Sequence, residues 1–436
     1  MRFYDRSQEI NTLHDLRKQS EAKAQFVLLT GRRRVGKTAL IRRAFGKKNL
    51  LYLFVARKSE HLLCAEFQRN AEASLGMRIH GHITGFRELF EELLIHAQTS
   101  HFTLVIDEFQ DFTRINPSIF SDMQNLWDRY KETSKINLIV CGSIYSLMIK
   151  IFESDKEPLF GRLTAKMMLR PFTPSVMKRL LKEHNPGFVP EDLLCLFMLS
   201  GGIPKYIELL MDAGATDADA MIKYASGNGS PFLSDGRDIL IPEFGKDYST
   251  YFSILQLIAA GKTSQSEVDS VIGKSTGSYL AILETEYSLV KKARPLFAKP
   301  GSRNIRWRIA DHYLNFWFRF IYANQTLVEL GRFDLLREWI EQDYKQYSGL
   351  VLEDYFRLKL AEGGRYTRIG QYWDRAGVNE LDVVALNDLG KKALVAEVKR
   401  NPDKIDLSIL KSKALALSSE LANYTVDFRG FSMRDM

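Results

Sequence analysis

The sequence has few cysteines, no long uninterrupted apolar run and no low-complexity tract, and each absence excludes a class of protein. Cys64, Cys141 and Cys195 are far apart, which argues against a disulfide framework or a cysteine metal site. No stretch reaches the roughly 20 apolar residues of a transmembrane helix, and the segment Met1–Arg6 lacks the apolar core of a signal peptide. We therefore expect buried thiols, a cytoplasmic protein and no membrane partner.

The chain also lacks a strong charge of either sign. It has 436 residues with 61 Lys and Arg against 53 Asp and Glu, so its formal net charge is only +8. This mild excess permits binding to nucleic acid without establishing it. The length predicts about two to four domains.

A glycine-rich loop that reads GRRRVGKT is the most informative motif. The apolar run Phe26–Leu29 precedes it and helix-forming residues follow it, so a buried strand enters the loop and a helix leaves it. Such a loop directs backbone N–H groups and the positive end of the helix at a phosphate. We expect Lys37 to reach the terminal phosphates of ATP and the Thr38 hydroxyl to bind Mg²⁺. The residues expected to contact nucleotide here are Gly31, Arg34, Val35, Gly36, Lys37, Thr38 and Ala39.

A second apolar run, Leu104–Ile106, ends in two carboxylates. Asp107 is expected to hold Mg²⁺, and Glu108 is expected to polarise the attacking water during hydrolysis. An acidic turn after a core strand would explain this pair if it stood alone. Together with the phosphate loop it predicts ATP hydrolysis.

Apolar strands alternate with amphipathic helices over the first 170 residues, which predicts a parallel sheet covered on both faces. The expected strands are Phe26–Thr30, Leu50–Val55, Leu104–Ile106, Ile136–Cys141 and Ala165–Leu169. The turn before the last strand presents Arg162. This arginine either stabilises charge on the transferring phosphoryl group or caps the next strand as a surface cation.

Helical periodicity follows, and Gly227–Gly236 is the best candidate for a linker because it is rich in Gly, Ser and Asp. Three short helices and a hairpin come next, which is a winged-helix pattern. They are expected at Tyr251–Ala259, Ser264–Ile272, Ser275–Thr285, Leu289–Lys292 and Asn304–Ile309, with a turn at Lys299-Pro300-Gly301. On the last strand Arg306 and Arg308 share one face, which predicts either contact with a DNA backbone or packing on another domain.

The last third holds a second group of charged residues. Its expected elements are a helix at Gly349–Ala361, strands at Tyr366–Tyr372, Glu380–Leu386 and Ala393–Lys399, a helix at Ile405–Glu420 and a strand at Tyr424–Phe428. Asp382 lies on the middle strand, and Glu397 and Lys399 share one face of the next. Two carboxylates beside an ammonium predict a hydrolytic Mg²⁺ site in which Lys399 acts on the water. Surface salt bridges would explain any one of these residues but explain the set poorly.

The N-terminal half resembles an archaeal-type ATPase of the signal-transducing P-loop (STAND) class, close to AAA proteins. The resemblance is carried by Phe3-Tyr4-Asp5-Arg6 with Glu9, by Gly31–Thr38, Val105–Gln110, Gly142-Ser143, Phe160–Arg162 and Gly201–Pro204. It implies that Arg6 lies near the nucleotide and that Gly202 and Pro204 lie near the adenine. It also implies that Ser143 is a sensor and that Arg162 is a sensor or finger arginine.

The C-terminal third resembles the PD-(D/E)xK nuclease-like domain that is often fused to such ATPases. Here the matching residues are Glu353, Trp373-Asp374-Arg375, Asn379–Asp382 and Glu397-Val398-Lys399. The resemblance implies that Glu353, Asp382 and Glu397 bind metal and that Lys399 is catalytic.

These patterns together predict an α/β protein with a P-loop ATPase sheet, a helical lid, a winged-helix domain and a C-terminal restriction-endonuclease-like domain. The expected boundaries are 1–170, 171–235, 236–335 and 336–436. We expect an ATP-binding and ATP-hydrolysing switch that couples nucleotide state to a DNA-acting nuclease-like domain, with ATP and Mg²⁺ as cofactors. The alternative is an ATP-gated regulator or scaffold whose nuclease-like domain binds without cleaving, and an oligomer is compatible with either.

Overall fold

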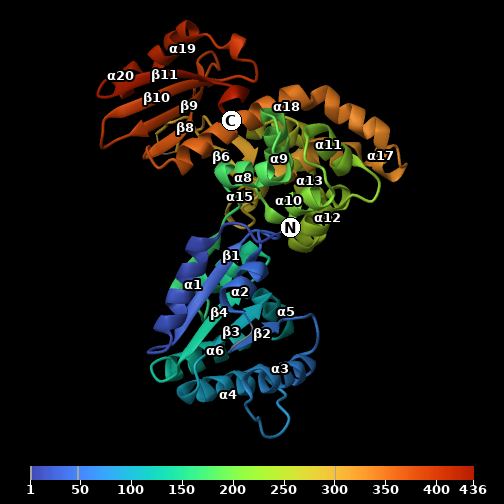
Figure 1. The fold of residues 1–436 in the computed structure, drawn as a ribbon, viewed down its shortest axis with the longest axis vertical. Helices are drawn as coiled ribbons and strands as arrows, with labels where there is room; N and C mark the ends of the chain where they lie inside the picture. The colour runs from blue at the N-terminus through green and yellow to red at the C-terminus, as the bar shows by residue number, and fades with distance from the viewer. Residues whose placement is uncertain (1, 47–48, 300) are drawn as a thin grey trace. The chain divides into compact units, whose positions relative to one another are not determined.

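A computed structural model describes residues 2–46, 49–299 and 301–436. The described chain divides into two compact units, one ending at Arg170 and the other beginning at Pro171. Figure 1 shows the first unit in blue to green and the second in green to red. Within the described residues, no helix combines the length and the apolar character needed to span a membrane.

The first unit contains a parallel sheet of five strands in the order β2-β3-β4-β1-β5, with helices packed on it (Figure 1). The strands are β1 (Gln25–Gly31), β2 (Leu50–Phe54), β3 (Phe102–Asp107), β4 (Ile136–Cys141) and β5 (Ala165–Leu169). The helical segments are α1 (Ser7–Gln19), α2 (Lys37–Phe45), α3 (Glu60–Leu75), α4 (Phe86–Thr99), η1 (Phe109–Asp111), α5 (Phe112–Ile115), α6 (Ile119–Tyr130) and α7 (Tyr145–Glu153). The predicted parallel α/β sheet is confirmed.

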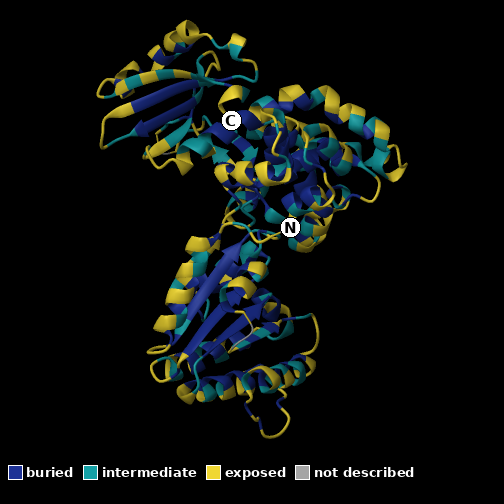
Figure 2. Ribbon diagram, viewed as in Figure 1, coloured by how far each residue is buried: buried dark blue, intermediate teal, exposed yellow. Residues whose placement is uncertain are grey.

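The side chains of β1 show that the sheet is buried on both faces. Phe26 and Leu28 belong to one hydrophobic core, whereas Val27 and Leu29 belong to a second core. Successive side chains of a strand point to opposite faces, so a continuous apolar run fits only a strand buried on both sides. Figure 2 shows these strands in the colour of buried residues, with exposed residues on the outer faces of the helices.

The second unit begins with helices that lead into a winged-helix arrangement. They are α8 (Pro174–His184), α9 (Pro190–Ser200), α10 (Pro204–Asp212), α11 (Ala218–Ser226), α12 (Pro231–Phe244) and η2 (Gly245–Asp247). The next elements are α13 (Tyr248–Ala259), α14 (Gln265–Ile272), α15 (Gly277–Thr285), β6 (Val290–Ala293) and β7 (Arg306–Ile309). Strands β6 and β7 pair in antiparallel fashion, as the predicted hairpin requires. The predicted turn includes Pro300, which lies outside the described residues.

A helical segment then leads into a second sheet, whose strand order is β11-β10-β9-β8. The segment comprises α16 (His312–Phe316), η3 (Trp317–Ile321), η4 (Tyr322–Asn324), α17 (Gln325–Glu329) and α18 (Phe333–Glu362). The sheet and its covering turns are β8 (Arg368–Trp373), β9 (Glu380–Asn387), β10 (Lys392–Val398), η5 (Pro402–Lys404), α19 (Leu407–Ala414), η6 (Leu415–Leu417), α20 (Ser418–Leu421), β11 (Thr425–Phe431) and η7 (Met433–Asp435). Strands β8, β9 and β10 are antiparallel neighbours and β11 runs parallel to β10, so the predicted helix and strand order is confirmed.

The predicted linker at Gly227–Gly236 is wrong, because α12 begins inside it. The Ser230 hydroxyl caps this helix by accepting a hydrogen bond from Phe232 N. Asp235 is buried and accepts a hydrogen bond of 2.8 Å from the Tyr206 hydroxyl. Gly236 packs so closely on the Trp317 indole that a Cβ would collide with it. The small and polar residues therefore serve a cap, a buried hydrogen bond and a close contact.

Two predicted helices also differ in extent. The helix expected at Gly349–Ala361 is the second half of α18, which begins at Phe333. The helix expected at Ile405–Glu420 is divided into α19 and α20 by a tighter turn at Leu415–Leu417. The predicted span covered only part of α18, whose buried residues begin at Leu336, and backbone hydrogen bonding sets the ends of each helix.

Candidate nucleotide site and C-terminal carboxylate centre

The phosphate loop joins the end of β1 to the start of α2. Gly31 has a φ of 146°, and a Cβ there would lie 2.6 Å from the Leu169 carbonyl oxygen, so only glycine fits. Gly36 precedes the first residue of α2 in a left-handed conformation. The loop interior therefore turns sharply back to the helix N-terminus, where the positive end of the helix dipole favours an anion.

Lys37 lies over this loop. Its ammonium donates to the carbonyl oxygens of Gly31 at 2.9 Å and Arg32 at 3.3 Å. Burial lowers the pKa of Lys37. A buried ammonium whose hydrogen bonds go to carbonyl oxygens gains strongly from a nearby anionic ligand.

Asp107 gathers donors from three neighbouring elements at the same edge of the sheet. Its Oδ2 accepts a hydrogen bond from Thr38 Oγ1 at 3.4 Å and another from the Tyr52 hydroxyl, and its Oδ1 accepts from Cys141 Sγ at 3.1 Å. Burial raises the pKa of Tyr52 and of Cys141, so both donate as neutral groups. Thr38 and Asp107 thus place two hard oxygen donors together, which suits Mg²⁺.

Glu108 follows Asp107 with a left-handed φ of 53°. Its Oε2 accepts hydrogen bonds from Ser143 Oγ at 2.7 Å, Ser143 N at 3.1 Å and Gln110 Nε2 at 2.5 Å. Ser143, which is expected to be a sensor, therefore holds Glu108, which is expected to be the base. This contact gives the end of β4 a direct influence on the direction of the Glu108 carboxylate.

Arg6 lies at the edge of the sheet that carries the phosphate loop. Its guanidinium donates to the Arg170 carbonyl at 2.7 Å and forms an ion pair with Glu9 at 3.0 Å. Arg170 follows Leu169, which is the strand partner of Gly31. The first turn of α1 is thereby fixed beside the loop.

Arg162 lies at the opposite edge of the same sheet. It precedes β5, and Thr164 N donates to Phe26 O near the start of β1. Its guanidinium pairs with Asp128 of α6 at 3.1 Å and donates to Phe160 O. Parallel strands carry their amino ends on one edge, so Arg162 cannot act on a phosphate at the loop of its own chain. The expectation of a sensor arginine within the chain is corrected accordingly.

Gly202 and Pro204 belong to the second unit. Phe172 N donates to Gly202 O at 2.7 Å, and Pro204 is the first residue of α10. Their predicted position at the adenine stays a prediction.

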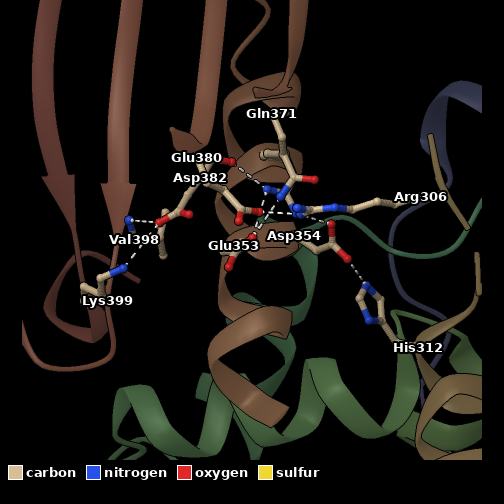
Figure 3. A network of polar contacts seen from close by, with 10 residues as sticks. Arg306, His312, Glu353, Asp354, Gln371, Glu380, Asp382, Val398 and Lys399 are labelled. Carbon is tan, nitrogen blue, oxygen red and sulfur yellow. Dashed lines mark hydrogen bonds and ion pairs between the residues drawn. The ribbon is translucent and has the colours of Figure 1, made fainter. Parts of the chain in front are cut away.

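The C-terminal sheet brings Asp382 and Glu397 to neighbouring positions, because Ala396 of β10 pairs with Val383 of β9. Lys399 Nζ lies 3.1 Å from Glu397 Oε1 and 3.8 Å from Asp382 Oδ2. Figure 3 shows the Asp382 carboxylate directed at Val398 and Lys399. Although burial opposes its charge, the two carboxylates raise the pKa of Lys399, so this side chain is an ammonium.

Glu353 reaches this centre from α18 and is engaged by protein donors. Gln371 Nε2 donates to Glu353 Oε2 at 2.9 Å, and Arg357 Nη1 lies 3.5 Å from the same atom. Burial and the nearby Asp382 raise the pKa of Glu353 to about 7. Across the part of the chain that is described, no three His, Cys, Asp or Glu residues form a group that could hold a metal ion. The expected three-carboxylate set is therefore not assembled, since Arg357 and Gln371 occupy Glu353.

A buried polar network connects this centre to helix α9. Arg357 donates to the Asp382 carbonyl at 2.6 Å and to Asp354 Oδ1 at 2.5 Å. Asp354 Oδ2 lies 3.9 Å from His312 Nε2, and the His312 ring packs on Phe197 of α9 with centroids 4.6 Å apart. Figure 3 shows this series of side chains from Asp382 to His312. Although burial disfavours charge at Asp354, Arg357 outweighs it and holds the pKa of that carboxyl well below its usual range.

The wing packs on the C-terminal sheet. Arg306 pairs with Glu380 at 2.5 Å and lies over the Trp373 ring at 4.5 Å, and Leu296 N donates to Gln371 O at 2.7 Å. We considered DNA contact and packing on another domain for the face that carries Arg306 and Arg308. Arg306 packs on the C-terminal sheet.

Comparison with known proteins assigns the N-terminal region. Residues 3–210 match the family model described as an ATPase domain predominantly from Archaea, and residues 317–408 match a model of archaeal and bacterial proteins of unknown function. The chain carries an archaeal-type ATPase domain. Its second matched region contains Glu353, Asp382, Glu397 and Lys399.

Several known proteins are similar to most of this chain. An uncharacterized protein of Methanocaldococcus jannaschii is 29% identical over 91% of this chain and 87% of its own length. A Walker-type ATPase of Pyrococcus abyssi is 18% identical, with a TM-score of 0.56 over 72% of this chain and 96% of that one. The ORC2 protein of Aeropyrum pernix, solved with ADPNP and ADP, is 15% identical over 74% and 94% of the two chains with a TM-score of 0.43. The similarity to the Pyrococcus structure shows the P-loop ATPase fold.

Sequence reasoning missed several residues around both centres of this ATPase-containing chain. Tyr52 contacts Asp107 from the neighbouring strand, and no local motif marks it. Gln110 lies within the motif Val105–Gln110 but received no role. Arg357 was detectable in principle, because it follows Asp354 by three residues and Glu353 by four, spacings that share a helix face.

Proposed function

We propose that this protein binds and hydrolyses ATP, and that its nucleotide state acts on a metal-dependent centre that cleaves DNA. The convergence of Lys37, Thr38, Asp107 and Glu108 at one edge of the parallel sheet carries the ATPase part of the proposal. Phosphoryl transfer to water needs little beyond such positioning and charge.

At this site Lys37 would neutralise the terminal phosphates of ATP, and Thr38 and Asp107 would hold Mg²⁺. The bound metal supplies charge that offsets negative charge on the transferring group. Glu108 would take a proton from the attacking water, and Ser143 would control the direction of its carboxylate. Arg162 would act only on a neighbouring copy in an oligomer, because it lies at the far edge of its own sheet.

In the C-terminal centre Asp382 and Glu397 would hold Mg²⁺, and Lys399 would orient the attacking water. Glu397 Oε2 supports this assignment, because it is a buried carboxylate oxygen that has no hydrogen-bond partner among the described residues. Such an acceptor is costly unless a cation or donor satisfies it. Glu353 would join only after release from Arg357 and Gln371.

Contacts within the second unit support a link between the two activities. We assign residues 1–170 to the ATPase core, 171–235 to its lid, 236–335 to the winged helix and 336–436 to the nuclease-like domain. The lid helix α9 contacts the carboxylate centre through His312, Asp354 and Arg357. It also carries Glu191, which pairs at 2.6 Å with Arg400, the residue after Lys399. If the lid moved when nucleotide bound, both the His312–Phe197 contact and the Glu191–Arg400 ion pair would therefore change.

A regulator that binds nucleic acid or protein without cleavage is the second candidate. The engagement of Glu353 by Arg357 and Gln371 favours it, because this centre then holds two carboxylates in place of three. In that case the centre would serve as a fixed polar surface.

One assay separates the two candidates. The full-length protein is incubated with supercoiled plasmid and Mg²⁺ or Mn²⁺, with ATP, ADP or a non-hydrolysable analogue. We expect nucleotide-dependent nicking that is lost in Glu397→Ala and in Lys399→Ala, while both variants keep wild-type ATP hydrolysis. The matched control is Glu420→Ala, which removes an exposed carboxylate of α20.

Cleavage that persists in Glu397→Ala would overturn the nuclease assignment. An intact plasmid under every nucleotide condition, with normal ATP hydrolysis, would favour the regulator. Absence of ATP hydrolysis in the wild-type protein would overturn the ATPase mechanism.

A further inference from the structure

A groove of about 860 Å³ opens beside the carboxylate centre. Its walls come from the start of α9, the middle of α18, the end of β10 and the last turn of the chain. Glu353 and Lys399 both line it, so one end of the groove is the centre itself. This volume exceeds that of a bound ion or a water cluster and falls in the range of sites for organic ligands.

The groove has a basic lining. Its charged residues are Lys345, Lys399, Arg400, Lys404 and Arg434 against Glu191 and Glu353. The Arg400 guanidinium is committed to Glu191 and to the Ser348 hydroxyl, each at 2.6 Å. Lys399 is committed to Glu397.

Three of the groove cations have no ion-pair partner among the described residues. The side chains of Lys345, Lys404 and Arg434 are exposed, and within the described ranges they form no hydrogen bond or ion pair. They come from three separate segments of the chain yet line one groove, together with Glu353 and Lys399 of the carboxylate centre. Unpaired cations that converge on one groove favour a ligand with several negative charges.

The same groove exposes apolar surface. Leu350 and Val189 are 53% and 52% exposed, which is high for aliphatic side chains, and they lie among the cations. A lining that combines positive charge with apolar surface suits a ligand that carries both anionic and less polar groups. A nucleic-acid strand, with phosphates separated by sugars and bases, has this character.

We infer that this groove binds a single strand of nucleic acid, with Lys345, Lys404 and Arg434 contacting successive phosphates of the backbone. The strand then passes Lys399 and reaches Asp382 and Glu397. The inference rests on the proposed function only for what happens at that end, because binding in the groove needs neither metal nor ATP. A mononucleotide would meet one or two of the cations, whereas a strand meets all three.

The test measures binding of a fluorescent single-stranded oligonucleotide to the full-length protein in EDTA. The variant Lys345→Gln/Lys404→Gln is compared with Lys246→Gln/Lys392→Gln, which removes the same charge from exposed lysines outside the groove. At about 0.1 M salt we expect roughly twentyfold weaker binding in the groove variant, because each lost phosphate contact forgoes the release of about 0.7 of a counterion. The slope of log affinity against log salt should become shallower by about 1.4, which is two contacts at about 0.7 each, and the control should match wild type.

The outcomes distinguish this inference from the proposed cleavage. Groove-dependent binding in a protein that never nicks DNA supports the groove and overturns the nuclease. Nicking with equal binding by both double variants supports the nuclease and overturns the groove. Binding of polyglutamate or of a mononucleotide with the same dependence and the same affinity as the oligonucleotide would also overturn the inference, because the groove would then recognise charge alone.

Discussion

The ATP site and the C-terminal carboxylate centre are built by different means. In the ATP site the backbone forms most of the phosphate cradle, since a tight loop joins β1 to α2 and the Lys37 ammonium donates to the carbonyl oxygens of that loop. In the C-terminal centre side chains hold one another, since the Glu353 carboxylate is contacted by Arg357 of its own helix and by Gln371 of β8. A backbone cradle leaves its side chains available for ligand, whereas a side-chain network engages them with one another.

This difference has a consequence for how each site is switched. For the proposed hydrolysis, Glu108 would have to turn away from Ser143 and Gln110. For the proposed three-carboxylate metal site, Glu353 would have to be released from two donors, one on its own helix and one on β8. The second site is therefore the better placed of the two to be held inactive and to depend on a signal from elsewhere.

The largest effect that would sharpen this comparison is expected from Glu108→Gln. The amide keeps the size and can still bond to Ser143, but it cannot take a proton, so the ATP hydrolysis rate should fall by about a hundredfold to ten-thousandfold. Affinity for Mg-ATP should stay near wild type. Steady-state phosphate release and calorimetry measure the two effects, with the exposed Glu132→Gln as control. Normal ATP hydrolysis by Glu108→Gln would mean that Asp107 and Glu108 form only a structural turn.

Arg357→Leu should have the next largest effect, and on stability. It leaves Asp354, whose side chain is only 22% exposed, without its strongest partner, which should lower the free energy of unfolding of the second unit by about 3–5 kcal/mol. Hydrogen exchange in β8, β9 and β10 reports on this unit separately from the ATPase core. Arg337→Leu is the matched control, because its partners Glu341 and Asp219 lie at the surface of the same unit and such pairs contribute about 0–1 kcal/mol. Equal losses in both variants would contradict a side-chain network that holds the centre.

The same contrast explains how much the sequence could predict. The phosphate loop and the strand that leads into it could be placed from the sequence, because the loop is contiguous and the strand has a two-sided apolar pattern that only a buried parallel strand shows. The order of helices and strands along the C-terminal region was also predicted. These features depend on neighbours along the chain.

What the sequence could not provide are contacts between distant segments. The engagement of Glu353 by Gln371 depends on how α18 packs on β8. The place of Arg162 depends on which edge of the sheet its turn occupies, and a motif carries no such information. Gly236 looked like part of a linker because close packing on Trp317 and flexibility favour the same residue type.

Lys37→Ala should break the ATP site at the level of binding. Loss of a charge-assisted contact to phosphate costs roughly 1.5–3 kcal/mol, which corresponds to a tenfold to hundredfold weaker affinity for ATP. Calorimetry measures it, and Lys23→Ala, whose ammonium pairs with Glu132 at the surface, should bind as wild type does. An unchanged affinity for ATP would mean that the backbone of the loop binds the phosphates without help from the Lys37 side chain.

Tyr52→Phe should have the smallest effect and tests whether any side-chain support matters in the ATP site. The hydroxyl donates to the same Asp107 oxygen that faces Thr38, so its removal frees that carboxylate to turn and leaves a buried acceptor with one donor fewer. A neutral hydrogen bond contributes about 1 kcal/mol, so the Mg²⁺ concentration needed for half-maximal ATP binding should rise about fivefold. Tyr130→Phe removes a comparable tyrosine bond to Glu91 away from the loop and should leave that value unchanged. If Tyr52→Phe requires no more Mg²⁺ than Tyr130→Phe, the backbone and Thr38 orient Asp107 unaided. A larger shift than for Lys37→Ala would instead mean that the ATP site depends on a side-chain network as the C-terminal centre does.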